Sequence, residues 1–538
     1  MEAVNSYLSV KVTPMREQLN ATPYYEKEID RHYSTKFHYQ AATENQNLHK
    51  LSKTIWKSLG LEIQSDINGR SNNQTTLSGL DYLTLVVIQL FHNWDNDPRL
   101  ALASPSNNND IAVGSYYNTK KLSVPKLVRV FKALLEAGYL DRVNQSHTNK
   151  PNAQNTTSRI RASKKLNDMF NNVDATEFDV NLHAHDKMVF MTEWLVDDLG
   201  NPIKDKSNNK TLTKEVSVDE SLHHVKKMLV VIKDYNALLA RTHIDIASLD
   251  NPFVIRAGKN GKEQRLPINQ NSKFIKRVFS RGSWKSHGRF YGGFWQQVGN
   301  KDDNKYRNNI RINGNQTLEL DYSSLHPNIL TVEMNLPPSN DIYTLDGLVV
   351  PRFDLTTQRK IIKMAVMMLL NASNMDSAYN ALKGSFDTGD IKKTIKRKEF
   401  DAYVKAFIAK HPHLESKIAT DQGIRLMHID SQIIEHIIKN TTGQGIPILT
   451  VHDSIICQEK HSNLLEEAMR LATKEILGTE LSFDVSRTTQ SYAQGAINMG
   501  NKDFSNPIWE QFKTTAPKSA TTRHIDNLDK FNRYLRKS

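Results

Sequence analysis

Residues 318–327 read LELDYSSLHP, and this stretch predicts a strand that ends on an acidic side chain. Residues 317–320 (TLEL) are strand-like, Asp321 follows them directly, and a helix is expected to begin just beyond. The end of a strand is a rigid position, which suits a carboxylate that must hold a metal ion. Asp321 is therefore a candidate metal ligand, although a lone aspartate at such a position is more often an ordinary loop or capping residue.

A second aspartate interrupts an apolar run at residues 446–457 (IPILTVHDSIIC). The residues on both sides favour strands, so we expect a hairpin with Asp453 at its tip. Asp321 and Asp453 would lie together if their strands were neighbours in one antiparallel sheet. Two such carboxylates could hold two Mg²⁺ ions, with Mn²⁺ as the alternative, and a two-metal clamp is a recurrent solution to phosphoryl transfer.

Between the two aspartates lies an apolar helix that opens with the basic residues of RKIIK, residues 359–363. Arg359 and Lys363 are four residues apart and therefore share one helix face. Two neighbouring cations repel each other mildly, so their placement is sensible if a triphosphate binds there. The alternative is a basic edge of a core helix that only contacts water.

Three of these stretches resemble sequence motifs of known polymerases. LELDYSSLHP is similar to motif A of the family A and B polymerases, RKIIKMAVMMLLNA (residues 359–372) to the family A fingers helix, and ILTVHDSII (residues 448–456) to family A motif C. Their order and spacing agree with the family, and weaker matches extend the similarity over residues 277–459. The resemblance implies an α+β fold: a right-hand polymerase palm built on an antiparallel sheet, with helical fingers.

The same resemblance implies roles for individual residues. Asp321, Asp453 and the backbone carbonyl of Tyr322 would bind metal. Arg359 and Lys363 would hold the incoming triphosphate, and Lys363 would also donate a proton to the departing pyrophosphate. The remaining implied contacts are Tyr322, His326 and Met367 with the nucleotide, and His452, Arg289 and Arg307 with primer and template.

Two departures from the family fall on positions that select substrates. Met367 and Met368 occupy positions where family A fingers carry an aromatic residue and a glycine. His326 stands where family A DNA polymerases place a glutamate that excludes the 2′-hydroxyl. A histidine is bulky enough to exclude ribonucleotides, so deoxynucleotides are favoured. The opposite preference stays open, because phage-type single-subunit RNA polymerases also carry His-Asp-Ser in motif C.

The first part of the chain has a different pattern. Residues 79–94 and 124–135 are apolar at helical spacing, with Ser123 as an N-cap candidate, and residues 139–143 and 158–162 are strand-like. The stretch 77–166 resembles the winged helix-turn-helix of regulators and plasmid-type replication initiators. Its recognition helix would present Lys126, Arg129 and Lys132 to duplex DNA; the alternative is a solvated basic face.

Composition supports a polyanionic partner. The 538 residues include 71 Lys and Arg against 58 Asp and Glu, a net charge of +13, which favours nucleic acid. A single cysteine, Cys457, rules out an internal disulfide and a thiolate-rich metal site. The chain shows neither an apolar run near the ~18 residues that cross a bilayer nor a secretory signal. We expect a cytoplasmic protein, or one of the host cytoplasm if phage-encoded, with no membrane partner.

Polar stretches at residues 144–157 and 198–211 are predicted linkers. The domain prediction has five segments: an unassigned extension at 1–76, a winged-helix-like DNA-binding domain at 77–170, a helical connector or thumb-like region at 171–276, palm and fingers at 277–500, and a basic tail at 501–538.

The sequence thus favours a template-directed nucleotidyltransferase, a DNA-dependent DNA polymerase that replicates a mobile element or phage. Its expected partners are template and primer DNA, an origin duplex and nucleoside triphosphates. One alternative is a single-subunit RNA polymerase or primase that uses ribonucleotides, with RNA as a partner. The other is a DNA-binding replication initiator that carries out no synthesis.

Overall fold

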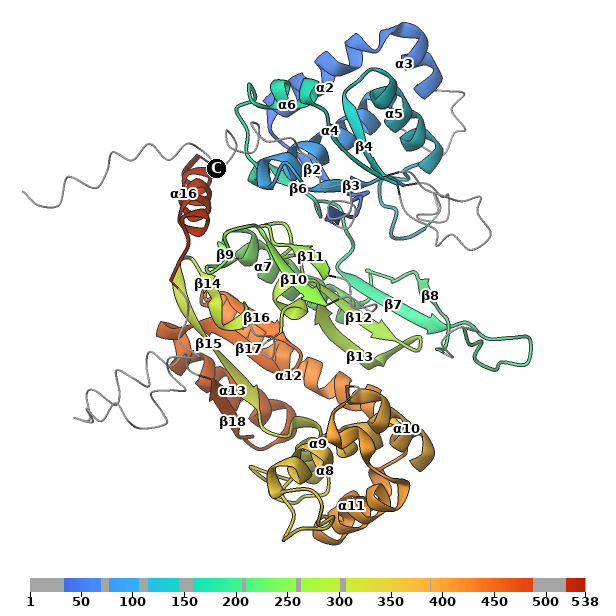
Figure 1. Cartoon of the computed structure of the whole chain (residues 1–538), viewed down its shortest axis with the longest axis vertical. Helices are drawn as coiled ribbons and strands as arrows, with labels where there is room; N and C mark the ends of the chain where they lie inside the picture. The colour runs from blue at the N-terminus through green and yellow to red at the C-terminus, as the bar shows by residue number, and fades with distance from the viewer. Residues whose placement is uncertain are drawn as a thin grey trace, which may run out of the picture. The chain divides into compact units, whose positions relative to one another are not determined.

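The computed structural model describes residues 33–68, 77–105, 115–144, 158–205, 210–257, 263–299, 306–387, 389–486 and 519–537. The chain divides into two compact units (Figure 1). The first comprises Met1–Lys187, Leu249–Ser272 and Ala520–Ser538, and the second comprises Met188–Ser248 and Lys273–Ser519. Both combine helices with sheets, as the α+β prediction requires. The units cut across the five predicted segments, because residues 249–272 and the C-terminal helix belong to the first unit.

The first unit is organised around one buried helix. Its helices are α2 (Gln46–Ser58), α3 (Gly60–Asn68), α4 (Gly79–Asn96), α5 (Val124–Glu136), α6 (Lys164–Phe170) and α16 (Thr522–Lys537). Helix α4 is apolar on most of its surface and lies at the centre of the core. A capping box between Ser78 and Asp81 satisfies the amides at its first turn.

Short strands complete this unit. A four-stranded sheet has the order β1 (Ser34–Thr35), β3 (Ala101–Ala103), β5 (Arg159–Ala162) and β4 (Leu140–Asn144). Two antiparallel pairs join β2 (Ala42–Thr43) to β6 (Val180–Asn181) and β10 (Phe253–Ala257) to β11 (Glu263–Pro267). The 3₁₀ turn η2 (Glu177–Asp179) precedes β6.

The two predicted helices and the two predicted strands of the winged-helix stretch are confirmed as α4, α5, β4 and β5, and β4 pairs with β5 in antiparallel fashion. Ser123 does stand at the N-cap of α5, but its side chain makes no capping hydrogen bond. The winged-helix interpretation itself stays a prediction. The predicted linker at 144–157 falls, apart from Asn144, outside the described residues.

The second unit contains a sheet in which every pairing is antiparallel. Its order is β16 (Ile448–Val451), β17 (Ser454–Gln458), β15 (Asn315–Tyr322), β14 (Ile310–Ile312) and β9 (Ile244–Ile246). Strand β18 (Phe483–Ser486) pairs with β15 on the edge that β14 also uses. Strands β16 and β17 are buried along their whole length, which explains their apolar sequences.

A second sheet of this unit has the order β13 (Ser283–Tyr291), β12 (Lys276–Ser280), β7 (Val189–Trp194) and β8 (Thr213–Val216). Strands β7 and β8 pair directly, and bridges join Val196 to Pro202 and Lys204 to Thr211. The predicted linker at 198–211 is therefore wrong where the structure describes it, since those residues extend a hairpin. Polar composition alone does not distinguish an exposed hairpin from a linker.

The α-helices among the described residues of this unit are α7 (His223–Ala240), α8 (Leu325–Glu333), α9 (Leu355–Asn371), α10 (Met375–Ser385), α11 (Arg397–Lys410), α12 (Gly423–Gly443) and α13 (Ser462–Leu477). Helix α12 packs against β13 and α13 through an apolar face. Helices α8 to α11 gather beyond the end of β15 (Figure 1). This arrangement brings α9 to the strand end that carries Asp321.

Candidate active site

The two predicted aspartates lie at neighbouring strand ends. Asp321 is the penultimate residue of β15, and its register partner on β17 is Ser454. The amide of Tyr322 donates a hydrogen bond of 3.3 Å to the carbonyl of Asp453, which lies in the tight turn between β16 and β17. The strands that lead to the two aspartates are therefore neighbours in one antiparallel sheet, which is the condition under which the two carboxylates would lie together.

Negative charge accumulates at this strand end. Burial, together with repulsion from Asp453, Glu319 and Asp484, raises the pKa of Asp321 to about 7 against the opposing effect of Lys363. A desolvated carboxylate beside another carboxylate is unfavourable until a cation neutralises it. Hard carboxylate oxygens are the ligands that Mg²⁺ prefers, so this donor set fits a divalent ion.

Helix α9 supplies positive charge, as predicted, but one of its two cations already has a partner. Arg359 donates two hydrogen bonds to Asp341, of 2.8 and 3.0 Å, in a bidentate ion pair. Lys363 lies close enough to Asp321 to lower the pKa of that carboxyl, and its Nζ is 5.9 Å from the ring centre of Tyr343. Lys363 is thus the basic residue directed at the acidic strand end.

A buried ion cluster stands beside the two aspartates. Asp430 of α12 is fully buried and accepts hydrogen bonds from Arg289, with Nε at 3.0 Å, and from Nε2 of His326 at 2.8 Å. Burial works against the charge of Arg289, but the hydrogen bonds and charge of Asp430 outweigh it and raise the Arg289 pKa. The imidazole of His326 is consequently held in one orientation near the start of α8.

His452 lies on the same side of the site. It lines a small cavity together with Arg289 and Asp430, and its ring centre is 5.9 Å from that of Tyr291. Burial and the positive charge of Arg289 lower the pKa of His452, which keeps the ring neutral. The structure thus brings three of the predicted residues, His452, Arg289 and His326, close to one another.

Arg307 is engaged within the protein. Its guanidinium donates to Glu319 at 2.9 Å and to the carbonyl of Val298 at 3.0 Å. The hydroxyl of Ser454 donates to the same Glu319 oxygen at 2.5 Å. Arg307 therefore braces the strands behind the aspartates, and its predicted contact with template stays a prediction.

Two further predicted nucleotide contacts differ in exposure. The Tyr322 side chain is buried, and its hydroxyl donates to the carbonyl of Met469 at 2.6 Å, so only its backbone is placed to serve a ligand. Met367 follows Lys363 by one helical turn, and 45% of its surface is exposed. Met367 is therefore accessible to a ligand on the face that carries Lys363.

The sequence reasoning missed two acidic residues of this site, Asp430 and Asp484. Asp484 lies on β18 directly opposite Asp321 in the register, so both side chains project from one face of the sheet. Its sequence signal was the short alternating segment LSFDVS at residues 481–486. The signal for Asp430 was an acidic residue within the largely apolar run RLMHIDSQIIEHII at residues 425–438.

The three predicted DNA contacts of the first unit lie together on α5. Lys126 is half-buried, whereas Arg129 and Lys132 are exposed. Arg129 donates to the carbonyl of Asp66 at 2.9 Å, and Lys132 is 3.8 Å from Glu136 of the same helix. These exposed, weakly held contacts leave both cations accessible to a phosphate backbone.

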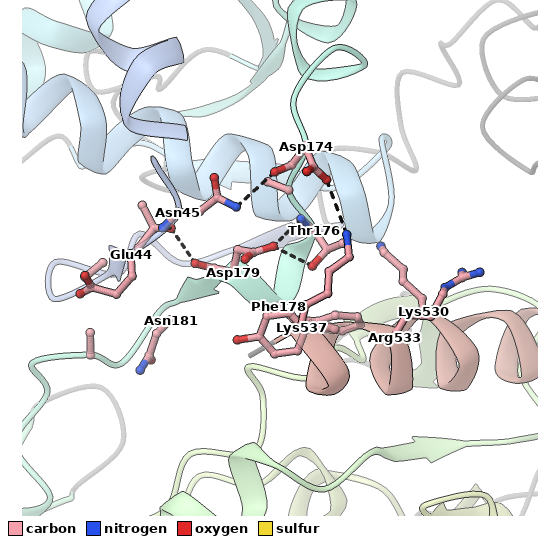
Figure 2. Close-up of a pocket in the computed structure, with 15 residues that line it drawn as sticks. Glu44, Asn45, Asp174, Thr176, Phe178, Asp179, Asn181, Lys530, Arg533 and Lys537 are labelled. Carbon is pink, nitrogen blue, oxygen red and sulfur yellow. Dashed lines mark hydrogen bonds and ion pairs between the residues drawn. The ribbon is translucent and has the colours of Figure 1, made fainter. Parts of the chain in front are cut away.

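The first unit also contains a cavity of about 670 Å³, one side of which is formed by α16 (Figure 2). Lys530, Arg533 and Lys537 line it together with acidic residues such as Asp174, which is 3.9 Å from Lys537. Because both signs of charge meet across the cavity, its lining does not define one class of ligand.

Comparison with known proteins leaves the family open. No protein family matches the chain, and no curated protein matches it. One similar solved structure is the POL domain of Pol1 from M. smegmatis in complex with DNA primer-template and dNTP, with 13% sequence identity and a TM-score of 0.26. The match covers 54% of this chain and 58% of that one. So low a score does not establish a shared fold.

Among the helices within the described ranges, none combines the length and the apolar character required to cross a membrane.

Proposed function

We propose that the chain is a template-directed nucleotidyltransferase, a DNA-dependent DNA polymerase with a right-hand palm and fingers that replicates a mobile element or phage. The observation that carries this proposal is the pairing of β15 with β17, which places Asp321 beside the turn that holds Asp453, with Lys363 close to Asp321. Acidic strand ends opposed by a basic helix are suited to a reaction on a triphosphate.

Asp321 and Asp453, with the backbone carbonyl of Tyr322, would hold two Mg²⁺ ions, and Asp484 is a further carboxylate on the same face of the sheet. When bound, such ions activate the attacking 3′-hydroxyl and neutralise the leaving pyrophosphate. The chain's own contribution is to hold the carboxylates together on paired strands.

Lys363 and Arg359 would bind the triphosphate. In this proposal the ammonium group of Lys363 gives a proton to the pyrophosphate oxygen as the bond to the α-phosphate breaks. Arg359 exchanges its ion pair with Asp341 for the triphosphate, which costs little because the Arg359 pair is largely exposed to solvent. Arg289 and His452 would contact the primer end.

His326 would select the sugar. Its ring is held by Asp430 at 2.8 Å, so it cannot turn aside to admit a 2′-hydroxyl without losing a hydrogen bond to a buried carboxylate. This fixed bulk favours deoxynucleotides. The alternative function, a ribonucleotide-using RNA polymerase or primase, is favoured by the absence of glutamate at this position and by the His-Asp-Ser sequence at residues 452–454.

The first unit would bind duplex DNA. Helix α5 is followed directly by the β4–β5 hairpin, and Arg129 and Lys132 are exposed on it. If only this unit were active, the chain would be a DNA-binding replication initiator that carries out no synthesis.

The test is extension of a labelled primer on a DNA template with Mg²⁺, using either deoxynucleotides or ribonucleotides. We expect extension with deoxynucleotides and its loss in Asp321→Asn and Asp453→Asn. The matched control is Asp234→Asn, because Asp234 is exposed on α7. Equal activity of Asp453→Asn and the wild type would refute the proposed site. Ribonucleotide extension without primer would favour the alternative.

A further inference from the structure

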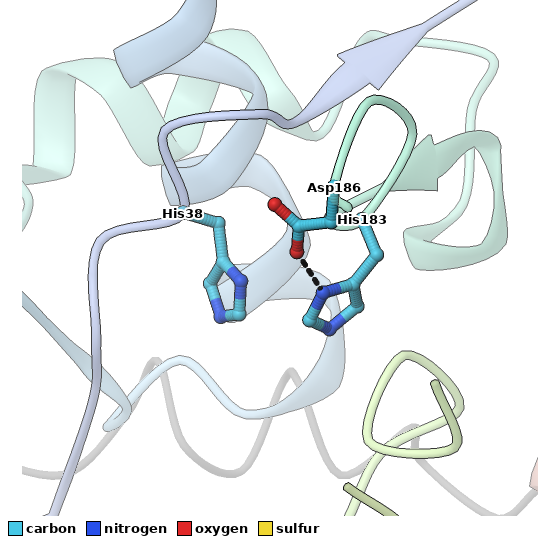
Figure 3. A group of neighbouring side chains, drawn as sticks. All are labelled: His38, His183 and Asp186. Carbon is cyan, nitrogen blue, oxygen red and sulfur yellow. Dashed lines mark hydrogen bonds and ion pairs between the residues drawn. The ribbon is translucent and has the colours of Figure 1, made fainter. Parts of the chain in front are cut away.

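Three residues with metal-binding side chains meet in the first unit, separately from the acidic strand ends. His38, His183 and Asp186 each offer one ligand atom, and these atoms lie within 4.8 Å of one another (Figure 3). Nδ1 of His183 is 2.6 Å from a carboxylate oxygen of Asp186. The two imidazole rings lie 4.8 Å apart between their centres and are almost perpendicular, at 88°. No step of the proposed polymerase reaction uses this cluster.

The backbone around His38 is fixed by a buried side chain. Gln89 of α4 accepts a hydrogen bond of 2.7 Å from the amide of His38 and donates one of 3.0 Å to its carbonyl. Gln89 is itself held by the carbonyl of Leu85 at 2.9 Å. His38 is therefore anchored to the central helix of the unit, although it belongs to an irregular segment between β1 and β2.

The other two residues come from one tight turn after β6. The side chain of Asn181 accepts a hydrogen bond of 2.9 Å from the amide of His183, and the amide of Asp186 donates to the carbonyl of His183 at 3.2 Å. Figure 3 shows these two side chains on a single turn, with His38 facing them from a separate segment. The cluster thus joins chain segments far apart in the sequence, both held in place by other contacts.

The ring nitrogens of His38 are also placed to accept a ligand. No hydrogen bond is recorded for the ring of His38 within the described parts of the chain. Nε2 of His92 is buried and has no hydrogen-bond partner among the described residues. Buried polar atoms are rarely left unsatisfied without a ligand or a water nearby.

We infer that His38, His183 and Asp186 form a binding site for a transition-metal ion, for which Zn²⁺ is the best fit. Two imidazoles and a carboxylate are a common zinc ligand set, whereas Mg²⁺ and Ca²⁺ prefer oxygen ligands alone. At metal–ligand bonds of about 2.0–2.1 Å in tetrahedral geometry, two ligand atoms lie about 3.3 Å apart. The contact between His183 and Asp186 therefore has to lengthen by less than 1 Å.

The site would act as a structural clamp. It would tie the segment around His38 to the turn at residues 183–186. This turn directly precedes Lys187, where the first chain segment of this unit ends. Zinc that binds the folded state and not the unfolded state raises thermal stability in proportion to its free concentration. The inference is independent of the polymerase proposal, because the ligands belong to different residues in a different unit.

The test uses the full-length protein after removal of metals with a chelator, followed by addition of Zn²⁺ alone. Bound zinc is measured by elemental analysis after gel filtration, and the thermal midpoint is measured at increasing Zn²⁺. We expect the wild-type chain to bind one zinc ion. His38→Gln and Asp186→Asn should each lose this ion and bind zinc at least tenfold more weakly. Two variants provide independent tests in case one of them fails to fold.

His185→Gln is the matched control, since His185 is an exposed histidine of the same turn outside the cluster. Asp453→Asn controls for zinc bound at the acidic strand ends. Both controls should keep the zinc and the rise in thermal midpoint. Zinc retained by both cluster variants, or lost equally in His185→Gln, would overturn the inference and leave an ordinary hydrogen bond between His183 and Asp186. Failure of primer extension would not affect this result.

Discussion

Replacing Asp430 with asparagine should destabilise the second unit more than the loss of an exposed ion pair would. Asp430 is fully buried and neutralises Arg289, whose side chain is only 13% exposed. Asparagine has nearly the same shape but cannot neutralise the guanidinium. Breaking a buried pair on one side typically costs about 3–5 kcal/mol, and an amide oxygen can still accept one hydrogen bond, so we expect about 3 kcal/mol.

A double-mutant cycle separates this effect from simple loss of packing. Arg289→Met alone leaves His326 as the one hydrogen-bond partner of the Asp430 charge among the described residues, and it should cost a similar amount. The double variant removes both charges, so its cost should fall short of the sum of the single costs by about 2 kcal/mol. The exposed, bidentate pair of Arg425 with Glu333 is the matched control, and Glu333→Gln should cost less than about 1 kcal/mol.

The assay is scanning calorimetry of the four proteins of the cycle and of the control. A cost of 3 kcal/mol corresponds to a fall in the transition temperature of about 6–12 °C for a unit of roughly 150–250 residues, and somewhat less for a larger one. Additive costs, within about 0.5 kcal/mol, would refute the view that Asp430 serves mainly to neutralise Arg289. So would a cost for Asp430→Asn no larger than that of Glu333→Gln.

Three further predictions concern the reaction. His326→Ala should raise ribonucleotide relative to deoxynucleotide incorporation by at least about tenfold, because it removes the bulk expected to exclude the 2′-hydroxyl; an unchanged ratio in single-nucleotide incorporation would contradict the assignment. Lys363→Gln should lower kcat by about 10²- to 10⁴-fold, because it removes the proton donor, whereas Arg359→Gln should mainly raise KM. Steady-state kinetics in which each variant changes kcat and KM to the same extent would argue against separate roles for the two residues. Asp484→Asn should raise the Mg²⁺ concentration needed for half-maximal extension several-fold, while Asp234→Asn leaves it unchanged; a metal titration that is identical for both would exclude Asp484 from the site.

Much of the local structure could be predicted from the sequence. The apolar runs around Asp321 and Asp453 became β15, β16 and β17, and the helical spacing after Arg359 became α9. These predictions succeed because side-chain periodicity and turn residues act over a few neighbouring positions. The turn at His452 and Asp453 is of this kind, since two strand-favouring runs flank it directly.

Other features depended on chain segments that are distant in the sequence. The basic residues Arg289, Arg307 and Arg359 were all predicted to bind nucleic acid or nucleotide, yet each forms an ion pair with a carboxylate of the same unit. A charged residue in a sequence does not reveal which opposite charge the fold brings to it. The same holds for the polar stretch at residues 198–211, whose described residues form part of a hairpin.

The sequence by itself determined that two aspartates end or interrupt apolar strands and that a basic helix lies between them. Only the tertiary structure decided that Asp321 pairs with Ser454 on one edge and with Asp484 on the other, that Asp430 holds His326, and that His38 meets His183. The physical reason is register. Side chains alternate between the two faces of a strand, so a shift of one residue in pairing would place Asp484 on the opposite face from Asp321.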